Sequence, residues 1–340
     1  MSKTTIVPVD CDNGYLYLYV MKHISILALQ NATLTSIDGS FQLLSRVNDF
    51  LKYKDKKPFY NVEIIGIKNS VKLNDGLYNI KVHRLVKDMK KTDLIIVPIT
   101  CADFAETIQA NKGFTNWVKD QYRRGAEVAS LCVGAFFLAS TGLLDGKECS
   151  THWAVSTEFK TFFPKVKMMD EKIITYDKGI YTSGGNYSFL NLLLHIIEKD
   201  LGKEIAVLAS KMFEIEIGRK TQNEFLIFQG QKQHGDEVII GIQNFIEKSY
   251  TDEIVVDQIT RKFGIGRRTL ERRFKALTGN TVFEYIQRVR VEAAKKELES
   301  GKKNINEIVY EVGYIDPDAF RNVFKRYAGM SFNEYAHKYR

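Results

Sequence analysis

The chain has 340 residues, of which 44% are hydrophobic and 26% are charged, so it can bury a core and is expected to form at least two domains. No stretch approaches the roughly 18 consecutive apolar residues of a membrane span, and no secretory signal is recognisable at the N-terminus. We therefore expect a cytoplasmic protein without a membrane partner. The net charge of +8 suggests a polyanionic partner if the basic side chains share one face.

The cysteines argue against two kinds of site. Cys11, Cys101, Cys132 and Cys149 are the four in the chain, and none of them forms a CxxC pair or a zinc-ligand pattern with histidine. They are also too sparse for a disulfide framework. We therefore expect reduced thiols, no metal site and no cofactor.

Residues 1–20 form a leader, because Met21 would itself make a natural start. Over residues 21–215, apolar β-branched runs alternate with helical stretches, which predicts an α/β domain with a covered parallel sheet. The predicted strands are residues 23–29, 62–67, 93–99 and 127–131, and the predicted helices include residues 113–125 and 187–202. Ligands bind such sheets at the carboxyl ends of the strands. Thr100 to Asp103, Cys132 and Thr182 to Asn186 all fall at these ends.

The stretch AEVASLCVGAFFLASTGLLDG, residues 126–146, places Cys132 between a short strand and a helix. Ser130 and Gly134 flank it, in the pattern of a nucleophile elbow with Cys in place of Ser. The helix N-terminus would then favour the thiolate. The alternative is a buried cysteine that only packs, since free cysteine is among the most buried residue types.

Residues 216–237 are polar and Gln-rich and are interpreted as a linker. Residues 238–340 are helical throughout and contain an internal repeat. Each copy is a short helix, a turn after a glycine and a second helix with apolar residues at i, i+4 and i+7, which predicts two helix-turn-helix motifs. Val256, Ile259, Gly264, Leu270, Phe274, Leu277 and Gly279 recur as Ile305, Ile308, Gly313, Phe320, Phe324, Tyr327 and Gly329.

Helical periodicity predicts which side chains the two second helices expose. Opposite the buried residues of the first lie Arg268, Arg272 and Lys275, with Arg267 and Glu271 at the flanks. In the second, the corresponding residues are Asp318, Asn322 and Lys325, with Arg321 at the flank. Arg, Asn and acidic side chains can each bond base edges, which predicts double-stranded DNA as a partner. Lys275 and Lys325 lie farther along and are expected to meet phosphates.

The connector between the copies, residues 282–300, contains neither Pro nor Gly and is predicted to be one helix of about 28 Å. Two recognition helices at its ends could enter successive major-groove segments, about 34 Å apart on one face of DNA. One chain would then read two groove segments.

At residues 238–340 the sequence resembles the AraC-type DNA-binding domain. The similarity includes the RVRVEAAKKEL connector, the VGY turn and the FKRYAGMSFNEY end. It implies that Arg268, Glu271, Arg272, Asp318, Arg321 and Asn322 face bases. It also implies a homodimer and makes RNA polymerase a candidate partner. Phe332 stands where the family usually has Pro.

The N-terminal part, with LCVGAFFLASTGLLDGKECSTHW, resembles the PfpI-type domain of GlxA-like regulators, which implies a flavodoxin-like, class I glutamine-amidotransferase-like fold. Related enzymes need a histidine near the elbow cysteine and an acidic partner. Val133 replaces the adjacent histidine, and Ser36 stands near the acid position with Asp38 as the only close substitute. DLIIVPITCAD also lacks the glycine pair that supplies backbone donors. His152 is the remaining candidate base.

We therefore expect a sequence-specific transcriptional regulator, not an enzyme, whose N-terminal domain senses an unidentified small molecule and lacks a complete triad. The alternatives are a PfpI-type cysteine hydrolase or amidase with a DNA-targeting domain, and a thiol sensor that uses Cys132 and Cys101. The candidate effector-pocket residues are Thr100, Cys101, Cys132, Val133, His152, Ser183 and Asn186.

Overall fold

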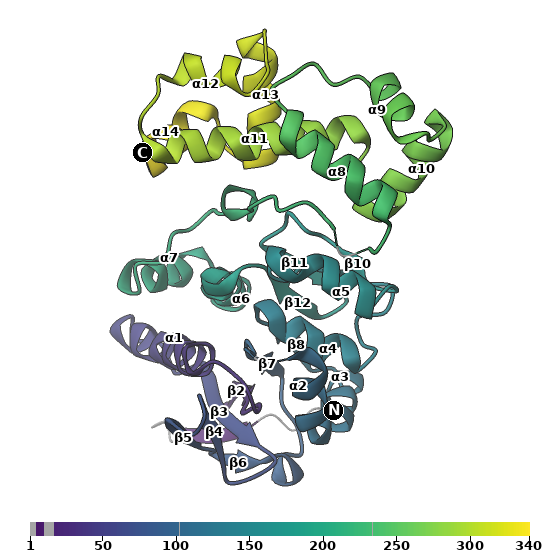
Figure 1. Ribbon diagram of the computed structural model, residues 1–340. Coiled ribbons are helices and arrows are strands. Elements are labelled where there is room, and N and C mark those ends of the chain that lie inside the picture. Colours follow the sequence, from purple (N-terminus) through teal and green to yellow (C-terminus); the bar gives the residue numbers. More distant parts are fainter. Residues whose placement is uncertain (1–4, 10–16, 102, 233) are drawn as a thin grey trace. The chain divides into compact units, whose positions relative to one another are not determined.

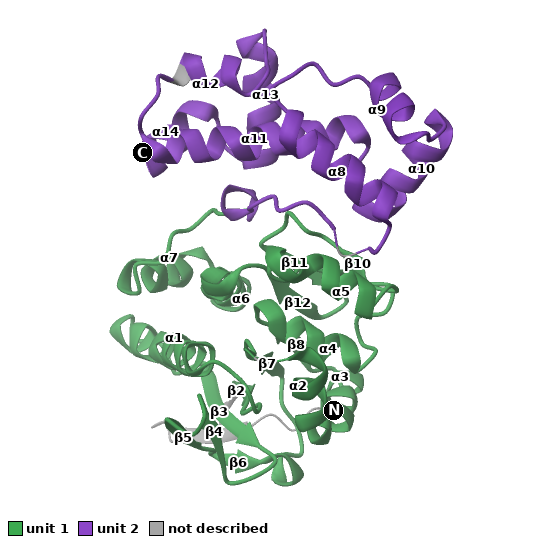
Figure 2. Ribbon diagram, in the orientation of Figure 1, with its two compact units in different colours: residues 1–220 green, residues 221–340 purple. Residues whose placement is uncertain are grey.

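The computed structural model describes residues 5–9, 17–101, 103–232 and 234–340 (Figure 1). It divides into two compact units, Met1–Lys220 and Thr221–Arg340 (Figure 2), and the division falls inside the predicted linker. Cys11, Ala102 and much of the predicted leader lie outside the described residues. Among the described residues, no helix combines the length and apolarity that crossing a membrane requires.

The N-terminal unit is built on an eight-stranded sheet of order β11-β12-β8-β7-β2-β3-β6, with β1 paired to β2. The strands from β12 to β6 along this order are parallel, whereas β11 and β1 are antiparallel to their neighbours. The strand bounds are β1 Thr5–Val9, β2 Tyr17–Leu27, β3 Tyr60–Gly66, β6 Arg84–Leu85, β7 Leu94–Val97, β8 Glu127–Ser130, β11 Ile174–Asp177 and β12 Ile180–Ser183. Two small ribbons pair β4 Ser70–Leu73 with β5 Tyr78–Lys81 and β9 Glu148–Cys149 with β10 Lys167–Met168.

Helices cover both faces of this sheet (Figure 1). On one face α1 packs with α6 and α7, and elsewhere α2 packs with α4. The helix bounds are α1 Leu34–Tyr53, α2 Phe104–Ala110, α3 Thr115–Arg123, α4 Ala135–Ser140, α5 Ser156–Phe162, α6 Phe189–Leu201 and α7 Lys203–Met212. All four residues of β7 are buried, as expected for a central strand covered on both faces. The predicted flavodoxin-like fold is confirmed.

The C-terminal unit is helical, and its two repeats each form a helix-turn-helix. Its helices are α8 Glu237–Ser249, α9 Val256–Phe263, α10 Arg267–Thr278, α11 Val282–Ser300, α12 Ile305–Glu311, α13 Pro317–Ala328 and α14 Phe332–Tyr339. Gly264 and Gly313 occupy the turns with φ of 62° and 84°, where side-chain-bearing residues are strained. The connector α11 is one uninterrupted helix, as predicted, and begins with a capping box at Thr281.

The C-terminal unit has two hydrophobic clusters. One belongs to the first half of the unit, α8 to α10, and the other to the second half, α12 to α14, and α11 contributes to both. Leu270 and Phe274 of α10 are buried in the first, and Phe320 and Phe324 of α13 in the second. Phe332, where the AraC family usually has Pro, is buried in the second cluster directly after the Ser331 helix cap. The departure from Pro therefore supplies core packing without disturbing the start of α14.

Part of the predicted linker is bound to α11. We call residues 221–232 the strap. Lys295 Nζ donates to the Leu226 carbonyl at 2.9 Å, and the Phe228 backbone N–H donates to Glu292 Oε2 at 3.1 Å. Lys295 and Glu292 are both buried, so these backbone partners satisfy charges that would otherwise lie desolvated. The strap therefore belongs structurally to the C-terminal unit.

We expect a fragment of residues 235–340 to fold and bind DNA, as its separate core implies, but a fragment of residues 221–340 to be more stable. Without the strap, Lys295 and Glu292 lose backbone hydrogen-bond partners, which costs about 1–3 kcal/mol. Urea unfolding of both fragments, followed by far-UV circular dichroism, measures the difference. Equal free energies of unfolding would show that the strap contributes nothing in solution.

A candidate cysteine site and a candidate nucleic-acid interface

The predicted elbow is present at Cys132. Strand β8 ends at Ser130 and α4 begins at Ala135, and Cys132 lies between them with φ of 52°. This left-handed conformation is unusual for a residue with a side chain and is typical of a strained elbow. A Cβ atom at Gly134 would lie 2.4 Å from the Pro98 carbonyl oxygen. Glycine is therefore required for α4 to start this close to the end of β7.

The environment of the thiol does not favour a nucleophile. Cys132 is only 2% exposed, and its Sγ accepts hydrogen bonds from the backbone N–H groups of Val133 and His152. Burial nevertheless raises the pKa of the Cys132 thiol to about 12. Of the two interpretations of Cys132, the buried cysteine that only packs therefore fits better than the thiolate, because desolvation outweighs the two backbone donors. At neutral pH the group is a protonated thiol.

Within the described part of the chain, neither the ring of the candidate base nor the side chains of the two residues near the acid position are bonded to Cys132. His152 Nδ1 accepts the Ala154 backbone N–H at 3.1 Å, and burial lowers the pKa of its ring. Ser36 is buried and accepts the Ile99 backbone N–H at 3.1 Å, while Asp38 is exposed on α1. Among the described residues, the hydrogen bonds of Cys132 include neither an imidazole ring nor a carboxylate.

Of the other predicted effector-pocket residues, Val133 is part of the elbow itself, and Ser183 is bonded to it. Its Oγ accepts the Cys132 backbone N–H at 3.1 Å. Thr100 is buried at the end of β7, and Asn186 is exposed. Cys101 is exposed, and its Sγ lies 3.4 Å from the Asn31 carbonyl oxygen. The three described cysteines are free thiols, and no cluster of metal-ligating side chains occurs within the described ranges.

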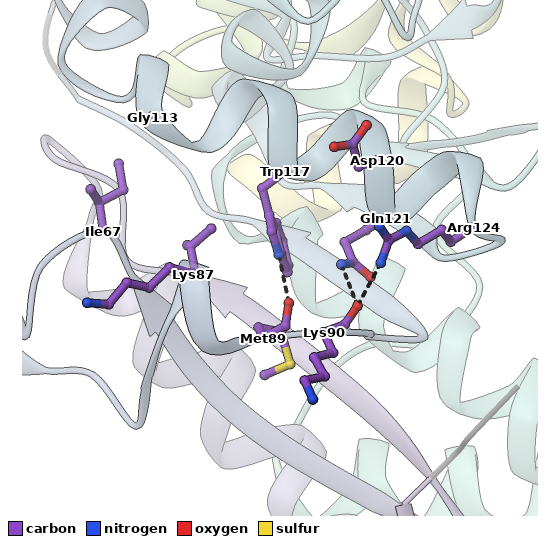
Figure 3. Close-up of a pocket in the computed structure, with 10 residues that line it drawn as sticks. Ile67, Lys87, Met89, Lys90, Gly113, Trp117, Asp120, Gln121 and Arg124 are labelled. Atoms are coloured by element: carbon purple, nitrogen blue, oxygen red, sulfur yellow. Dashed lines mark hydrogen bonds between the residues drawn. The ribbon is translucent and has the colours of Figure 1, made fainter.

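A pocket of about 580 Å³ lies between α3 and the segment that precedes β7, away from all of these residues (Figure 3). Trp117 Nε1 donates to the Met89 carbonyl at 3.3 Å, and both Gln121 and Arg124 donate to the Lys90 carbonyl at 3.2 Å. These bonds hold α3 against the segment. The sequence interpretation missed this pocket, which is lined by Ile67, Val86, Lys87, Met89, Lys90, Gly113, Trp117, Asp120, Gln121 and Arg124.

The nucleic-acid interface predicted on α10 is exposed. Arg268, Arg272 and Lys275 are exposed and form no ion pair with another described residue. Arg267, by contrast, bonds Glu271 at 3.2 Å and lies 3.6 Å from Asp257. Exposed pairs of this kind contribute little, so a phosphate or a base could replace them at low cost.

The second predicted face, on α13, is exposed as well. Asp318 and Arg321 pair with each other at 2.8 Å, whereas Asn322 and Lys325 are exposed without an ion pair among the described residues.

Arg273 of α10 does not belong to the exposed face of that helix, and the sequence interpretation did not distinguish it from the other arginines. It bonds Asp236, the N-cap of α8, at 2.6 Å and so holds two helices of the same half together.

Comparison with known proteins assigns both units. The DJ-1/PfpI family matches residues 56–199, and a helix-turn-helix domain family matches residues 259–338. The chain therefore joins a region similar to the DJ-1/PfpI family to a helix-turn-helix domain. Its N-terminal fold is similar to that of a candidate transcriptional regulator from Vibrio parahaemolyticus, with a TM-score of 0.51 and 20% identity over 56% of this chain and 98% of that one.

Two curated relatives align with much of the chain. The chain is 25% identical over 311 residues to the HTH-type transcriptional regulator GbdR of Pseudomonas aeruginosa, covering 90% of this chain and 82% of GbdR. It is 24% identical over 205 residues to the HTH-type transcriptional regulator GlxA of Rhizobium meliloti, covering 60% of this chain and 63% of GlxA. The similarity to GbdR therefore spans both units of this chain.

The DJ-1/PfpI domain should show a graded thiol reactivity. In a Cys11→Ser background at pH 8, we expect Ellman's reagent to label Cys101 rapidly and Cys132 and Cys149 only on unfolding. Cys101 is exposed, whereas burial raises the pKa of each of the other two thiols to about 12. Absorbance after mixing counts the reactive thiols, and rapid labelling of Cys132 would contradict its described burial.

Proposed function

We propose that this protein is a sequence-specific DNA-binding transcriptional regulator whose DJ-1/PfpI domain binds a small-molecule effector. The observation that carries the proposal is the pair of helix-turn-helix motifs on one helix, α11, each with an exposed face of base-bonding side chains. The relatives named as transcriptional regulators support it.

Each recognition helix has separate residues for reading bases and for binding phosphates. Arg268 and Arg272 lie in the first two turns of α10, where a recognition helix approaches base edges, and Arg can bridge O6 and N7 of guanine. Asp318, Arg321 and Asn322 occupy the equivalent turns of α13. Lys275 and Lys325 lie about a turn farther along, where the DNA backbone passes. Glu271 and Arg267 would exchange their mutual pair for contacts with DNA.

We assign the elbow to ligand contact or packing and not to catalysis. A buried, protonated Cys132 whose neighbouring imidazole ring caps a helix lacks the activated base of a hydrolase. Thr100, Cys101, Val133, Ser183 and Asn186 stay candidates for effector contact at the same strand ends. A thiol sensor is the second candidate, and the exposed Cys101 favours it. The proposal includes a cytoplasmic homodimer that acts with RNA polymerase.

Replacing Cys132 tests the assignment against a hydrolase. We expect Cys132→Ser to keep the melting temperature and the DNA affinity, because the smaller Oγ can still accept the N–H groups of Val133 and His152. The measurements are thermal unfolding, a DNA-binding titration and an assay with ester and amide substrates. Hydrolysis by the wild type that disappears in the variant would establish the enzyme instead.

Substitutions on α10 and α13 should distinguish the residues that set base specificity from those that set only affinity for DNA. On a duplex selected by the wild type from a random library, we expect Arg268→Ala or Arg272→Ala to lose about 1–3 kcal/mol of discrimination at particular bases. Lys275→Ala or Lys325→Ala should instead weaken selected and scrambled duplexes alike and reduce the slope of log K against log salt by about one unit. Arg321→Ala and Asn322→Ala should affect a second cluster of bases.

The measurement is a fluorescence-anisotropy titration of each variant at several salt concentrations. Arg46→Ala, which removes an exposed arginine from α1 in the other unit, is the matched charge control. Uniform weakening by Arg268→Ala, with base preference unchanged, would refute the recognition-helix assignment.

A further inference from the structure

One side chain joins the two halves of the helix-turn-helix domain. Arg290 lies near the middle of α11, and its Nε and Nη2 donate to the backbone carbonyls of Tyr250 and Asp252, each at 2.8 Å. These carbonyls belong to the α8–α9 loop (residues 250–255) of the first half. The same guanidinium lies 5.1 Å from the centre of the Tyr314 ring, which follows the turn glycine of the second half. Arg290 thus contacts both halves from the helix that links them.

The turn of the second motif rests directly on the α8–α9 loop. A Cβ atom at Gly313 would lie 2.7 Å from the Thr251 carbonyl oxygen and 2.9 Å from Arg290 Nη2. Contacts this short exclude any side chain, and the φ of 84° independently favours glycine. The Tyr250 ring also packs against both hydrophobic clusters. The two halves are therefore in contact away from α11 as well as through it.

The chemistry of Arg290 suits a side chain that holds two segments in a fixed relative orientation. Its guanidinium bonds two backbone carbonyls, and the Tyr250 carbonyl lies at the C-terminal end of α8, where the helix dipole favours a cation. A planar guanidinium can bond two carbonyls in fixed directions and stack on a ring at once. A lysine ammonium cannot reproduce that combination.

We propose that Arg290, with Gly313 and Tyr314, is a positioning element that fixes α10 relative to α13 and so sets the spacing of the two base clusters the protein can read. The inference rests on the proposed DNA-binding function. A rigid pair of recognition helices engages both groove segments as one unit, so the second contact gains the advantage of a preorganised partner. A mismatch in spacing must then break one of the two contacts.

The test uses the full chain and the selected duplex, with the two base clusters located by footprinting. One or two base pairs are inserted or deleted between the clusters, and each duplex is titrated with each variant. We expect the wild type to lose affinity about tenfold or more on an altered spacing, since the second contact becomes independent or is lost. Arg290→Gln should bind the original duplex more weakly and show a much smaller spacing penalty.

Arg288→Gln is the matched control, because Arg288 is a half-buried arginine on the same helix whose ring contacts, Phe228 of the strap and Tyr327 of α13, lie outside the α8–α9 loop and the Gly313 turn. It should keep the wild-type spacing penalty. Arg290→Lys keeps the positive charge but loses the planar guanidinium that bonds two carbonyls at once. We expect its spacing penalty to lie between those of the wild type and Arg290→Gln. Tyr314→Leu provides a second route if Arg290→Gln does not fold, which thermal unfolding will show.

The outcomes separate the two proposals. A wild type that selects no duplex would overturn the proposed function itself. A wild type that binds specifically but tolerates every spacing would overturn the positioning inference alone. A folded Arg290→Gln or Tyr314→Leu protein that keeps the full spacing penalty would also overturn it, whereas a reduced penalty in either, with Arg288→Gln unchanged, supports it.

Discussion

The C-terminal unit depends on the burial of its central helix, α11. Both helix-turn-helix halves and the strap pack on its 19 residues. Such a helix must bury polar groups as well as apolar ones, and each buried charge needs a partner. Lys295 and Glu292 find theirs in the strap, and Arg290 finds its partners in the α8–α9 loop. The polar contacts of α11 therefore decide which segments are held to it.

The strap follows the N-terminal unit in sequence, yet it packs with the C-terminal unit. Its backbone is bonded to α11, the helix that links the two helix-turn-helix motifs. Residues 221–232 are therefore part of the C-terminal unit.

The elbow shows that local geometry and chemical reactivity are separable. The strand-to-helix turn, the left-handed Cys132 and the closely packed Gly134 are all present. Reactivity also requires solvation or a countercharge for the thiolate, and here burial supplies neither. The same turn can therefore serve packing or ligand contact where neither a base nor an acid bonds the thiol.

The sequence by itself determined the features that depend on near neighbours along the chain. The alternation of apolar, β-branched runs with helical stretches predicted the parallel sheet, and the recurrence of Gly264 as Gly313 predicted two motifs on a single connector. The exposed faces of α10 and α13 followed from helical spacing, because a helix repeats its faces over a few residues.

Only the tertiary structure decided the rest. Lys22 pairs with Asp200, which is 178 residues away, at 2.6 Å, and Arg290 meets Tyr250 across 40 residues. No local pattern marks such partners. The protonation of Cys132 likewise depends on desolvation by strands and loops far along the chain, and the strap reads as a polar linker until its backbone is seen on α11. Burial and long-range pairing are properties of the packed chain, so periodicity and spacing alone do not encode them.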